Sequence, residues 1–330
     1  MNSYGALYNC KDILSQYSVC IRTLGTSANR FERLLRSIEG LTVQPNEIIV
    51  VLPHGYAAPP ELSGNEQVVF SNKGMLAQRI KGIESASNEH VLLLDDDVEF
   101  EPAIVNKLML AMAEYDADIV YPINRELLPS PGKAWLRAIT LQAIARKNQE
   151  VFIHMLPTGG YSYLDTDPPK PVPSESCPGM LLLAKRSVLL AINLDEDLWV
   201  DTSPYGFRDD AILSYKAHLL GYKIYAVPGI MTRHLCGTTR LDAKRDVYSA
   251  YSVGCNSLVF WKRFIYVNGK TVHKKLIAAT LFAWSITGMV LLYTVNSLLK
   301  CNLSIVNAYL KGTIAGMSKN DESITMQRMM

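Results

Sequence analysis

The sequence is poor in cysteine and lacks the patterns that give cysteines a structural or metal-binding role. Six cysteines are scattered over 330 residues, with no C-x-x-C pair and no zinc-like spacing. This scarcity argues for a reducing compartment and against a disulfide framework. The first twenty residues also lack a basic segment followed by an apolar run. We therefore expect no secretory signal and a body located in the cytosol.

Several catalytic signatures are missing. The chain has no G-x-S-x-G, no Walker-type GK[ST] loop with its upstream glycine, no G-x-G-x-x-G and no H-E-x-x-H. These absences disfavour serine hydrolases, P-loop nucleotidases, dinucleotide-binding enzymes and zinc proteases of the common types. Basic residues are not interleaved with aromatics along a surface pattern, so we predict no nucleic-acid partner.

Acidic residues are missing from one end of the chain. The totals, 33 Lys+Arg and 31 Asp+Glu, nearly balance, but no Asp or Glu occurs between Asp246 and Asp321. With 48% apolar and 19% charged residues, the chain is too apolar and too lightly charged to be disordered. The asymmetry predicts a folded body that carries a basic, apolar tail directed at a membrane.

Apolar runs alternate with helical periodicity in the first part of the chain. This rhythm is typical of right-handed βαβ crossovers and predicts an α/β fold with a mainly parallel sheet. Further along, we expect a helix over 133–148, a proline-rich loop over 161–177, a helix over 209–220 and a last strand over 222–227. The predicted strands of the first part are residues 17–24, 47–52, 68–70, 90–94 and 117–121.

The strongest chemical signal is the acidic run that ends the strand LLLDDD. Carboxylates at a strand end are ligands for Mg²⁺ or Mn²⁺, which also bridge to substrate phosphates. Alternate residues of an extended segment share a face, so Asp95 and Asp97 are expected to act together while Asp96 points elsewhere. A strand that simply ends in Asp-rich turn chemistry is the structural alternative. A second Asp-x-Asp, at Asp165 and Asp167, runs into two prolines and reads as a loop.

Two further features lie nearer the C-terminus. Asp209 and Asp210 begin the helix predicted over 209–220, where one acid is enough to cap free N–H groups. The second acid is therefore a candidate general base. His234 follows the last predicted strand, where a neutral imidazole could complete a metal shell or contact a pyrophosphate, although a lone histidine is more often surface or core.

These residues resemble family 2 glycosyltransferases of the GT-A fold. The similarity covers roughly residues 17–237 and includes YSVCIRTLGTSANRFERLLRSIEGL, NKGMLAQRIKGIESASNEHVLLLDDDVEFEP and GFRDDAILSYKAHLLGYKIYAVPGIMTRH. The resemblance implies a GT-A-like (Rossmann-like) sheet with flanking helices, a nucleotide-sugar donor and inversion at the sugar. It implies that Asp95 and Asp97 hold Mn²⁺ or Mg²⁺ on the donor diphosphate, with His234 as a further ligand.

The same resemblance implies the remaining roles. Asp210 is the expected general base, with Asp209 as the second choice. The expected donor contacts come from the first strand, the second helix and the acidic run. These are Thr23, Arg79, Asp95 and Asp96. One departure is that many family members carry an acid after the second strand that contacts the nucleotide base, whereas this chain has Leu-Pro-His-Gly at 52–55.

The predicted organisation has four parts: an N-terminal extension (1–16), a GT-A domain (17–240), a basic juxtamembrane segment (241–275) and an apolar or amphipathic tail (276–330). Residues 276–299 carry no charge over 24 residues, enough to span a bilayer, and five basic residues lie just before them. The positive-inside rule would keep this flank at the cytoplasmic face of the membrane. A span, an interfacial helix, and a helix packed on the body or on another subunit all remain open, so an oligomer is possible.

The sequence favours a membrane-associated, metal-dependent, inverting glycosyltransferase. Its acceptor would be a lipid-linked or cell-surface glycan. Transfer to polyprenyl phosphate is the nearest enzymatic alternative, because it uses the same donor side. A non-catalytic, membrane-anchored binding or assembly protein on a degenerate GT-A scaffold is the alternative from another class, motivated by the missing acid after the second strand.

Overall fold

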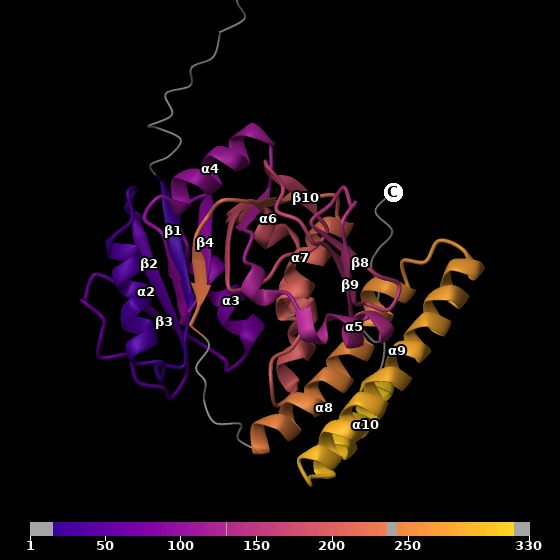
Figure 1. Ribbon diagram of the computed structural model, residues 1–330. Helices are drawn as coiled ribbons and strands as arrows, with labels where there is room; N and C mark the ends of the chain where they lie inside the picture. Colours follow the sequence, from indigo (N-terminus) through magenta and orange to yellow (C-terminus); the bar gives the residue numbers. More distant parts are fainter. Residues whose placement is uncertain (1–15, 130, 236–242, 320–330) are drawn as a thin grey trace, which may run out of the picture.

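The computed structural model describes residues 16–129, 131–235 and 243–319, and its centre is an eight-stranded sheet (Figure 1). The strand order is β10-β12-β6-β11-β4-β1-β2-β3. Two small sheets accompany it, β13-β5 and β7-β9-β8. The bounds are β1 (Tyr17–Arg22), β2 (Glu47–Pro53), β3 (Gln67–Ser71), β4 (His90–Asp95), β5 (Val98–Phe100), β6 (Ile119–Pro122), β7 (Ala143–Arg146), β8 (Ile153–Met155), β9 (Tyr161–Leu164), β10 (Val172–Ser174), β11 (Leu181–Lys185), β12 (Ile224–Val227) and β13 (Thr232–His234).

The prediction of an α/β fold with a mainly parallel sheet is confirmed, with antiparallel additions. β1 runs parallel to β2 and β4, β2 to β3, and β12 to β6. β11 is antiparallel to both β4 and β6, and β10 to β12. Because β11 runs in the opposite direction, it begins at the edge where β1 and β4 end. This edge is where ligands of such sheets usually bind.

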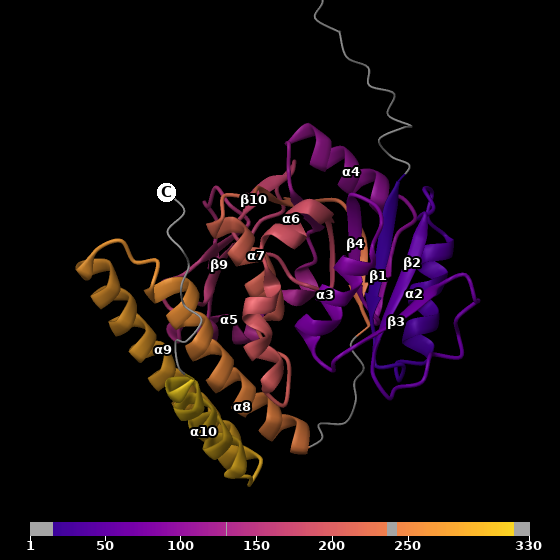
Figure 2. The ribbon, with the colours of Figure 1, turned by 180° about the vertical axis from the view of Figure 1, so that it is seen from behind.

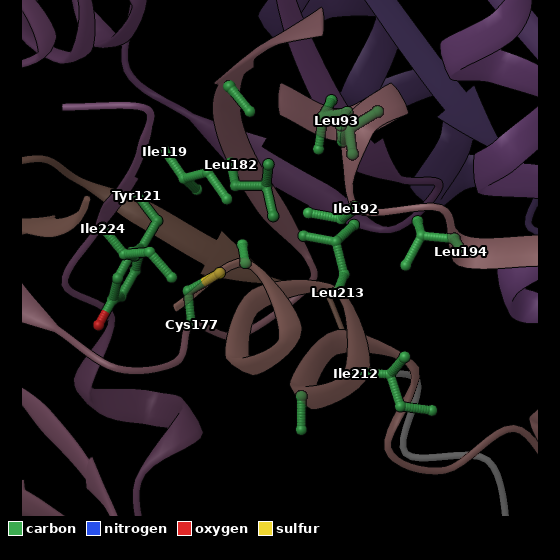
Figure 3. Close-up of a cluster of buried hydrophobic side chains, with 14 of the residues drawn as sticks. Leu93, Ile119, Tyr121, Cys177, Leu182, Ile192, Leu194, Ile212, Leu213 and Ile224 are labelled. Atoms are coloured by element: carbon green, nitrogen blue, oxygen red, sulfur yellow. The ribbon is translucent and has the colours of Figure 1, made fainter. Parts of the chain in front are cut away.

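Helices cover both faces of the sheet, so its inner strands are buried on both sides, as parallel sheets require. Alternate residues of β1 show this: Cys20 belongs to one core, with α3, α6 and α7, whereas Val19 and Ile21 belong to the other, with α2 and α4. Figure 3 shows Leu93, Leu182 and Leu213 in the first of these cores. The helices are α2 (Asn29–Glu39), α3 (Met75–Ser85), α4 (Ile104–Glu114), α5 (Pro131–Ile139), α6 (Arg186–Ala191) and α7 (Asp209–Leu219).

Two sequence predictions for the middle of the chain are wrong. The helix expected over 133–148 ends at Ile139, Leu141 takes a left-handed backbone conformation, and the chain continues as β7. The loop expected over 161–177 contains β9 and β10. Both errors have the same kind of cause. The short strands β7, β8 and β9 pair with one another and β10 pairs with β12, and local periodicity does not reveal such pairing.

The C-terminal part forms a helical layer on one side of the body (Figures 1 and 2). It consists of α8 (Ala243–Phe260), a π-helical turn (Trp261–Tyr266), α9 (Val272–Leu299) and α10 (Ser304–Ser318). Phe260 and Phe264 are buried in the core shared with α7. α10 approaches α8 closely at Gly254, Gly312 and Gly316, where an added Cβ would meet backbone atoms of the facing helix. α9 is long and apolar enough to cross a membrane, a criterion that buried helices of soluble proteins also meet.

Candidate active site

The acidic run does not continue β4 as an extended segment. β4 ends at Asp95, Asp96 and Asp97 form a turn, and β5 starts at Val98. The premise that Asp95 and Asp97 share one face of a strand is therefore wrong. The three carboxylates have separate partners: Asp95 pairs with Arg22, Asp96 accepts hydrogen bonds from two hydroxyls, and Asp97 lies against His234.

Arg22 is a central site residue that sequence reasoning missed. It ends β1 directly opposite Asp95 in the parallel register. Its Nε donates to Asp95 Oδ1 at 2.6 Å and its Nη2 to Asp95 Oδ2 at 3.0 Å, while its Nη1 donates to Asp209 Oδ2 at 2.7 Å. Bidentate pairs of this kind are strong and directional. One guanidinium thus ties the end of β4 to the start of α7. The sequence did contain a signal for Arg22, because it is a charged residue at the end of a buried strand.

Asp209 and Asp210 occupy different electrostatic environments although they are adjacent. Burial opposes ionisation of Asp209, yet Arg22 and Arg79 hold the pKa of its carboxyl below the ordinary value. Burial and the neighbouring Asp209 charge raise the pKa of Asp210, against weaker opposition from Arg79 and Arg208. Displacement of two neighbouring pKa values in opposite directions is typical of a charged structural acid beside a catalytic one.

Arg79, on α3, contacts both Asp95 and Asp209. Its Nη2 donates to the Gly179 carbonyl at 2.7 Å and lies 3.5 Å from Asp95 Oδ1 and 3.4 Å from Asp209 Oδ2. Its side chain is buried, and its Nη1 has no hydrogen-bond partner in the described parts of the chain. An added Cβ on Gly179 would lie 2.7 Å from Arg79 Nη1 and 2.7 Å from Asp210 Cβ. The segment before β11 therefore needs glycine to pack against these two groups.

His234 reaches the acidic turn because β13 pairs antiparallel with β5 and sets His234 opposite Val98. His234 Nε2 lies 3.1 Å from Asp97 Oδ1. Burial alone would raise the pKa of Asp97, but the hydrogen bond and charge of His234 hold it below the ordinary value. The same hydrogen bond raises the pKa of His234 against the effect of burial.

The donor set of the expected metal is partly assembled. Imidazole nitrogen and carboxylate oxygen are both ligands of Mn²⁺, and His234 and Asp97 already face one another. Asp95 is directed at Arg22 instead. Over residues 16–129, 131–235 and 243–319, no group of three or more His, Cys, Asp or Glu side chains is gathered as a metal site. The residues present fit a metal held by Asp97 and His234 whose other ligands come from outside the protein.

Thr23 and Asp96 form a local hydrogen-bonded unit. Thr23 Oγ1 and Ser27 Oγ each donate to Asp96 Oδ2 at 2.6 Å, and the Gly25 backbone N–H donates to Thr23 Oγ1 at 2.9 Å. Burial raises the pKa of Asp96 and the two hydroxyl bonds oppose this. The arrangement fastens the loop after β1 to the acidic turn. Where the resemblance has an acid after β2, this chain has His54, whose ring stacks at 6.1 Å on Phe70.

A family model described as glycosyl transferase family 2 matches residues 67–161, which include β4 and the acidic turn. An uncharacterized glycosyltransferase of Bacillus subtilis (strain 168), YwdF, is 33% identical over 114 residues. That match covers 28% of this chain and 42% of YwdF, so the chain matches less than half the length of this curated relative.

Among solved structures, the mannosyltransferase PcManGT from Pyrobaculum calidifontis, in complex with GDP-Man and Mn²⁺, is similar over 92% of this chain and 88% of its own. The TM-score is 0.51 at 14% identity. GalNAc-T7, with UDP, GalNAc and Mn²⁺, aligns over 83% of this chain and 56% of its own, with a TM-score of 0.49 and 14% identity.

Residues 67–161 therefore resemble family 2 glycosyltransferases, and the fold is that of PcManGT. The resemblance inferred from the sequence is confirmed for the fold and for this segment of the chain.

Proposed function

We propose that this chain transfers a sugar from a nucleotide-sugar donor to a lipid-linked or cell-surface glycan, with inversion and with Asp210 as the general base. The observation that carries the proposal is that two adjacent carboxylates have pKa values displaced in opposite directions. Asp209 is neutralised by Arg22 and Arg79, whereas Asp210, packed beside Gly179, has a raised pKa. A base poised nearer neutrality is more effective at taking a proton from an acceptor hydroxyl.

The donor side of the proposal uses the edge where β1 and β4 end. Asp97 and His234 would hold a divalent metal, with Asp95 nearby on Arg22. When bound, such a metal neutralises charge on a nucleoside-diphosphate leaving group. PcManGT, of the same fold, was solved with GDP-Man and Mn²⁺, which supports a nucleotide-sugar and a divalent metal as the ligands. Thr23 and Asp96 shape the loop on this side through their hydrogen bond.

The proposed setting is the cytoplasmic face of the membrane, reached through the tail at 276–330. The uncharged stretch of α9 and the basic residues before it support this placement. Transfer to polyprenyl phosphate uses the same donor machinery and differs only in the acceptor.

The test separates donor binding from chemistry. Purified full-length chain is first screened for thermal stabilisation by UDP-, GDP- and dTDP-sugars with Mn²⁺, because a ligand of the native state raises its stability. Release of nucleoside diphosphate is then measured with membrane extract as the source of acceptor. Asp210→Asn should lower turnover by about 10²–10⁴-fold while donor affinity stays within a few-fold.

Asp209→Asn is the matched control, since it removes the adjacent carboxylate. A larger loss of turnover in Asp209→Asn than in Asp210→Asn would move the base by one residue. The absence of stabilisation by all three donors, together with no turnover, would favour a non-catalytic binding or assembly protein.

A further inference from the structure

The outer side of α9 carries an apolar stripe that continues onto α5. We define the apolar stripe as Trp135 and Ile139 of α5 and Leu276, Trp284, Leu291 and Leu298 of α9, each with 55–62% of its surface exposed. The last three are spaced by seven residues, so they share one side of the helix. At 1.5 Å per residue the 28-residue α9 extends about 42 Å. Large exposed apolar side chains repeated over such a length mark an interaction site.

The opposite side of α9 contacts the rest of the protein at several points between Phe282 and Ser297. Phe282 stacks on Trp261 with ring centroids 4.3 Å apart, and Tyr293 stacks on Tyr309 at 4.6 Å. Ser297 Oγ accepts from the Val306 backbone N–H at 3.0 Å. These contacts come from the π-helical turn and from α10, and they leave only the outer side of α9 for another partner.

The middle of α9 also has polar contacts with the catalytic body. Trp284 Nε1 donates to the Ile139 carbonyl at 2.8 Å, and Gln142 Nε2 donates to Ser285 Oγ. Gly288 lies so close to Thr140 that an added Cβ would overlap its side chain. Figures 1 and 2 both show α5 beside the middle of α9.

These contacts exclude a simple crossing of the bilayer while the fold is intact. A spanning helix places its middle in the hydrocarbon core, about 30 Å thick. Trp284 to Gly288 would then carry α5 and β7 into that core with them, including the exposed Arg137 and the polar Gln142. Charged and polar groups are costly there. The geometry therefore favours a helix that lies parallel to the surface.

The charge around α9 is complementary to an anionic surface. Lys270, Lys274 and Lys275 gather near its N-terminal end, and residues 247–319 contain no Asp or Glu. Anionic lipid headgroups attract such clusters, and tryptophans with one apolar and one polar side are favoured at the membrane interface.

We infer that α9 lies flat on an anionic bilayer and that the apolar stripe on α5 and α9 enters the headgroup region of one leaflet. This inference rests on the membrane association in the proposed function. It specifies the geometry of that association, in which both ends of α9 lie on the same side of the membrane. The occupant of the stripe is lipid, and α5, far from the tail in sequence, is part of the docking surface.

The chain supplies its own reporter of sidedness, because Cys301 is exposed in the turn after α9, whereas Cys20, Cys177 and Cys255 are buried. Full-length chain is expressed in cells and recovered in sealed inside-out membrane vesicles. A membrane-impermeant maleimide is added, and the labelled peptide is identified by mass. Flat docking predicts that Cys301 is labelled without detergent, to the same extent as an Asn65→Cys control on the body.

A second experiment tests the stripe itself. Purified chain is floated with vesicles of phosphatidylcholine, with and without phosphatidylglycerol. Trp135→Ser and Leu291→Ser should each weaken binding by about tenfold, since each removes one large exposed apolar side chain that would enter the bilayer. Leu110→Ser is the matched control: this residue is half exposed on α4, outside the stripe, and its change should leave binding unaltered.

The outcomes are distinguishable. Cys301 protected until detergent is added, while the Asn65→Cys control is labelled, would overturn flat docking and leave the proposed membrane association in place. Binding that responds to Leu291→Ser but not to Trp135→Ser would remove α5 from the docking surface. A chain absent from membranes and from floated vesicles would contradict both the docking mode and the membrane setting, whereas the role of Asp210 is decided separately by donor turnover.

Discussion

At the scale of single residues, the site depends on how two arginines divide their charge among three acids. Arg22 and Arg79 both contact Asp95 and Asp209, and neither makes an ion pair with Asp210 in the described structure. Asp209 therefore has a structural role, in addition to lying next to the proposed base Asp210. Asp210 is left with a charge that its surroundings only partly compensate.

The two acids should have opposite effects on stability. Asp209 has a lowered pKa, so its ionised form stabilises the fold above the unfolded-state pKa, and this contribution is lost as pH falls through the lower folded-state pKa. Asp209→Asn should reduce the free energy of unfolding at pH 7 by about 1–3 kcal/mol. This loss is smaller than that expected when a buried arginine is left without any acidic partner, because both arginines still contact Asp95.

Asp210 has a raised pKa, so its ionised form costs stability once the pH exceeds the unfolded-state pKa. Asp210→Asn should therefore raise the unfolding midpoint at pH 7, and this gain should vanish at a pH where the acid is protonated in both states. Denaturant unfolding of the wild type, Asp209→Asn and Asp210→Asn between pH 2 and pH 8 measures both effects, because this range extends below the ordinary aspartate pKa of 3.8. Equal destabilisation by the two substitutions would contradict the proposed division of charge.

The pH dependence of turnover provides an independent measurement. A base with a raised pKa makes turnover fall on the acidic side at a higher pH than an ordinary aspartate would. Asp209 is one of the causes of this shift, so Asp209→Asn should move the acidic limb of the profile to lower pH. The profile is recorded at saturating donor. An acidic limb that does not move would mean that the titrating group is not beside Asp209.

At the scale of elements, β11 brings the two halves of the site together. It runs antiparallel between β4 and β6, so the residues before it lie at the edge where β4 ends, and the Asp95 backbone N–H donates to the Met180 carbonyl at 2.9 Å. Gly179 comes just before this contact and packs on Arg79 and Asp210. The segment Gly179–Met180, just before β11, is therefore part of the site together with the acids.

Gly179→Ala should damage the site through this contact. Its Cβ would overlap the Arg79 guanidinium and crowd Asp210, so we expect turnover to fall at least tenfold and the fold to lose about 1–3 kcal/mol from overpacking. Gly132→Ala, on α5, is the control because an added Cβ there meets no atom within 4 Å. Wild-type turnover in Gly179→Ala would show that the segment can shift without disturbing Asp210.

At the scale of the whole molecule, the C-terminal helices are continuous with the catalytic body. Asn256 of α8 donates to the Phe207 carbonyl just before α7, and Ser203 donates to Asn256 Oδ1 at 2.6 Å. α8 is in turn covered by α10. The helical layer that we propose to lie on the membrane therefore contacts the loop leading into the acid pair.

Removal of α9 and α10 should consequently weaken the fold and spare the donor side. A chain truncated after Val267 exposes Trp261 and the glycine-lined side of α8, so its unfolding midpoint should fall by several degrees. A nucleotide-sugar found to stabilise the full chain should still stabilise the truncated one, because no described donor-side residue belongs to α9 or α10. Thermal unfolding with and without that donor measures both. Loss of the donor effect would place part of the donor site in the tail.

Much of this arrangement could be predicted from the sequence. The apolar runs at 17–24, 47–52 and 90–94 predicted β1, β2 and β4 to within two residues at each end. The end of β4 at the acidic run was also predicted, because burial and charge are properties of adjacent residues. The partners of those acids could not be predicted. Arg22 and Asp95 are 73 residues apart, and Arg22 and Asp209 are 187 apart, and no local pattern encodes such pairs.

The sequence by itself determined the α/β class, the strand-end location of the acids, the acid pair at the start of α7 and the apolar character of α9. All of these follow from burial and periodicity within one element. Only the tertiary structure decided that Asp96 and Asp97 turn away from the strand, that two arginines neutralise Asp209 but not Asp210, and that α5 lies beside α9. These features depend on strand register and helix packing, in which the contact energy is shared between segments that no single stretch of sequence contains.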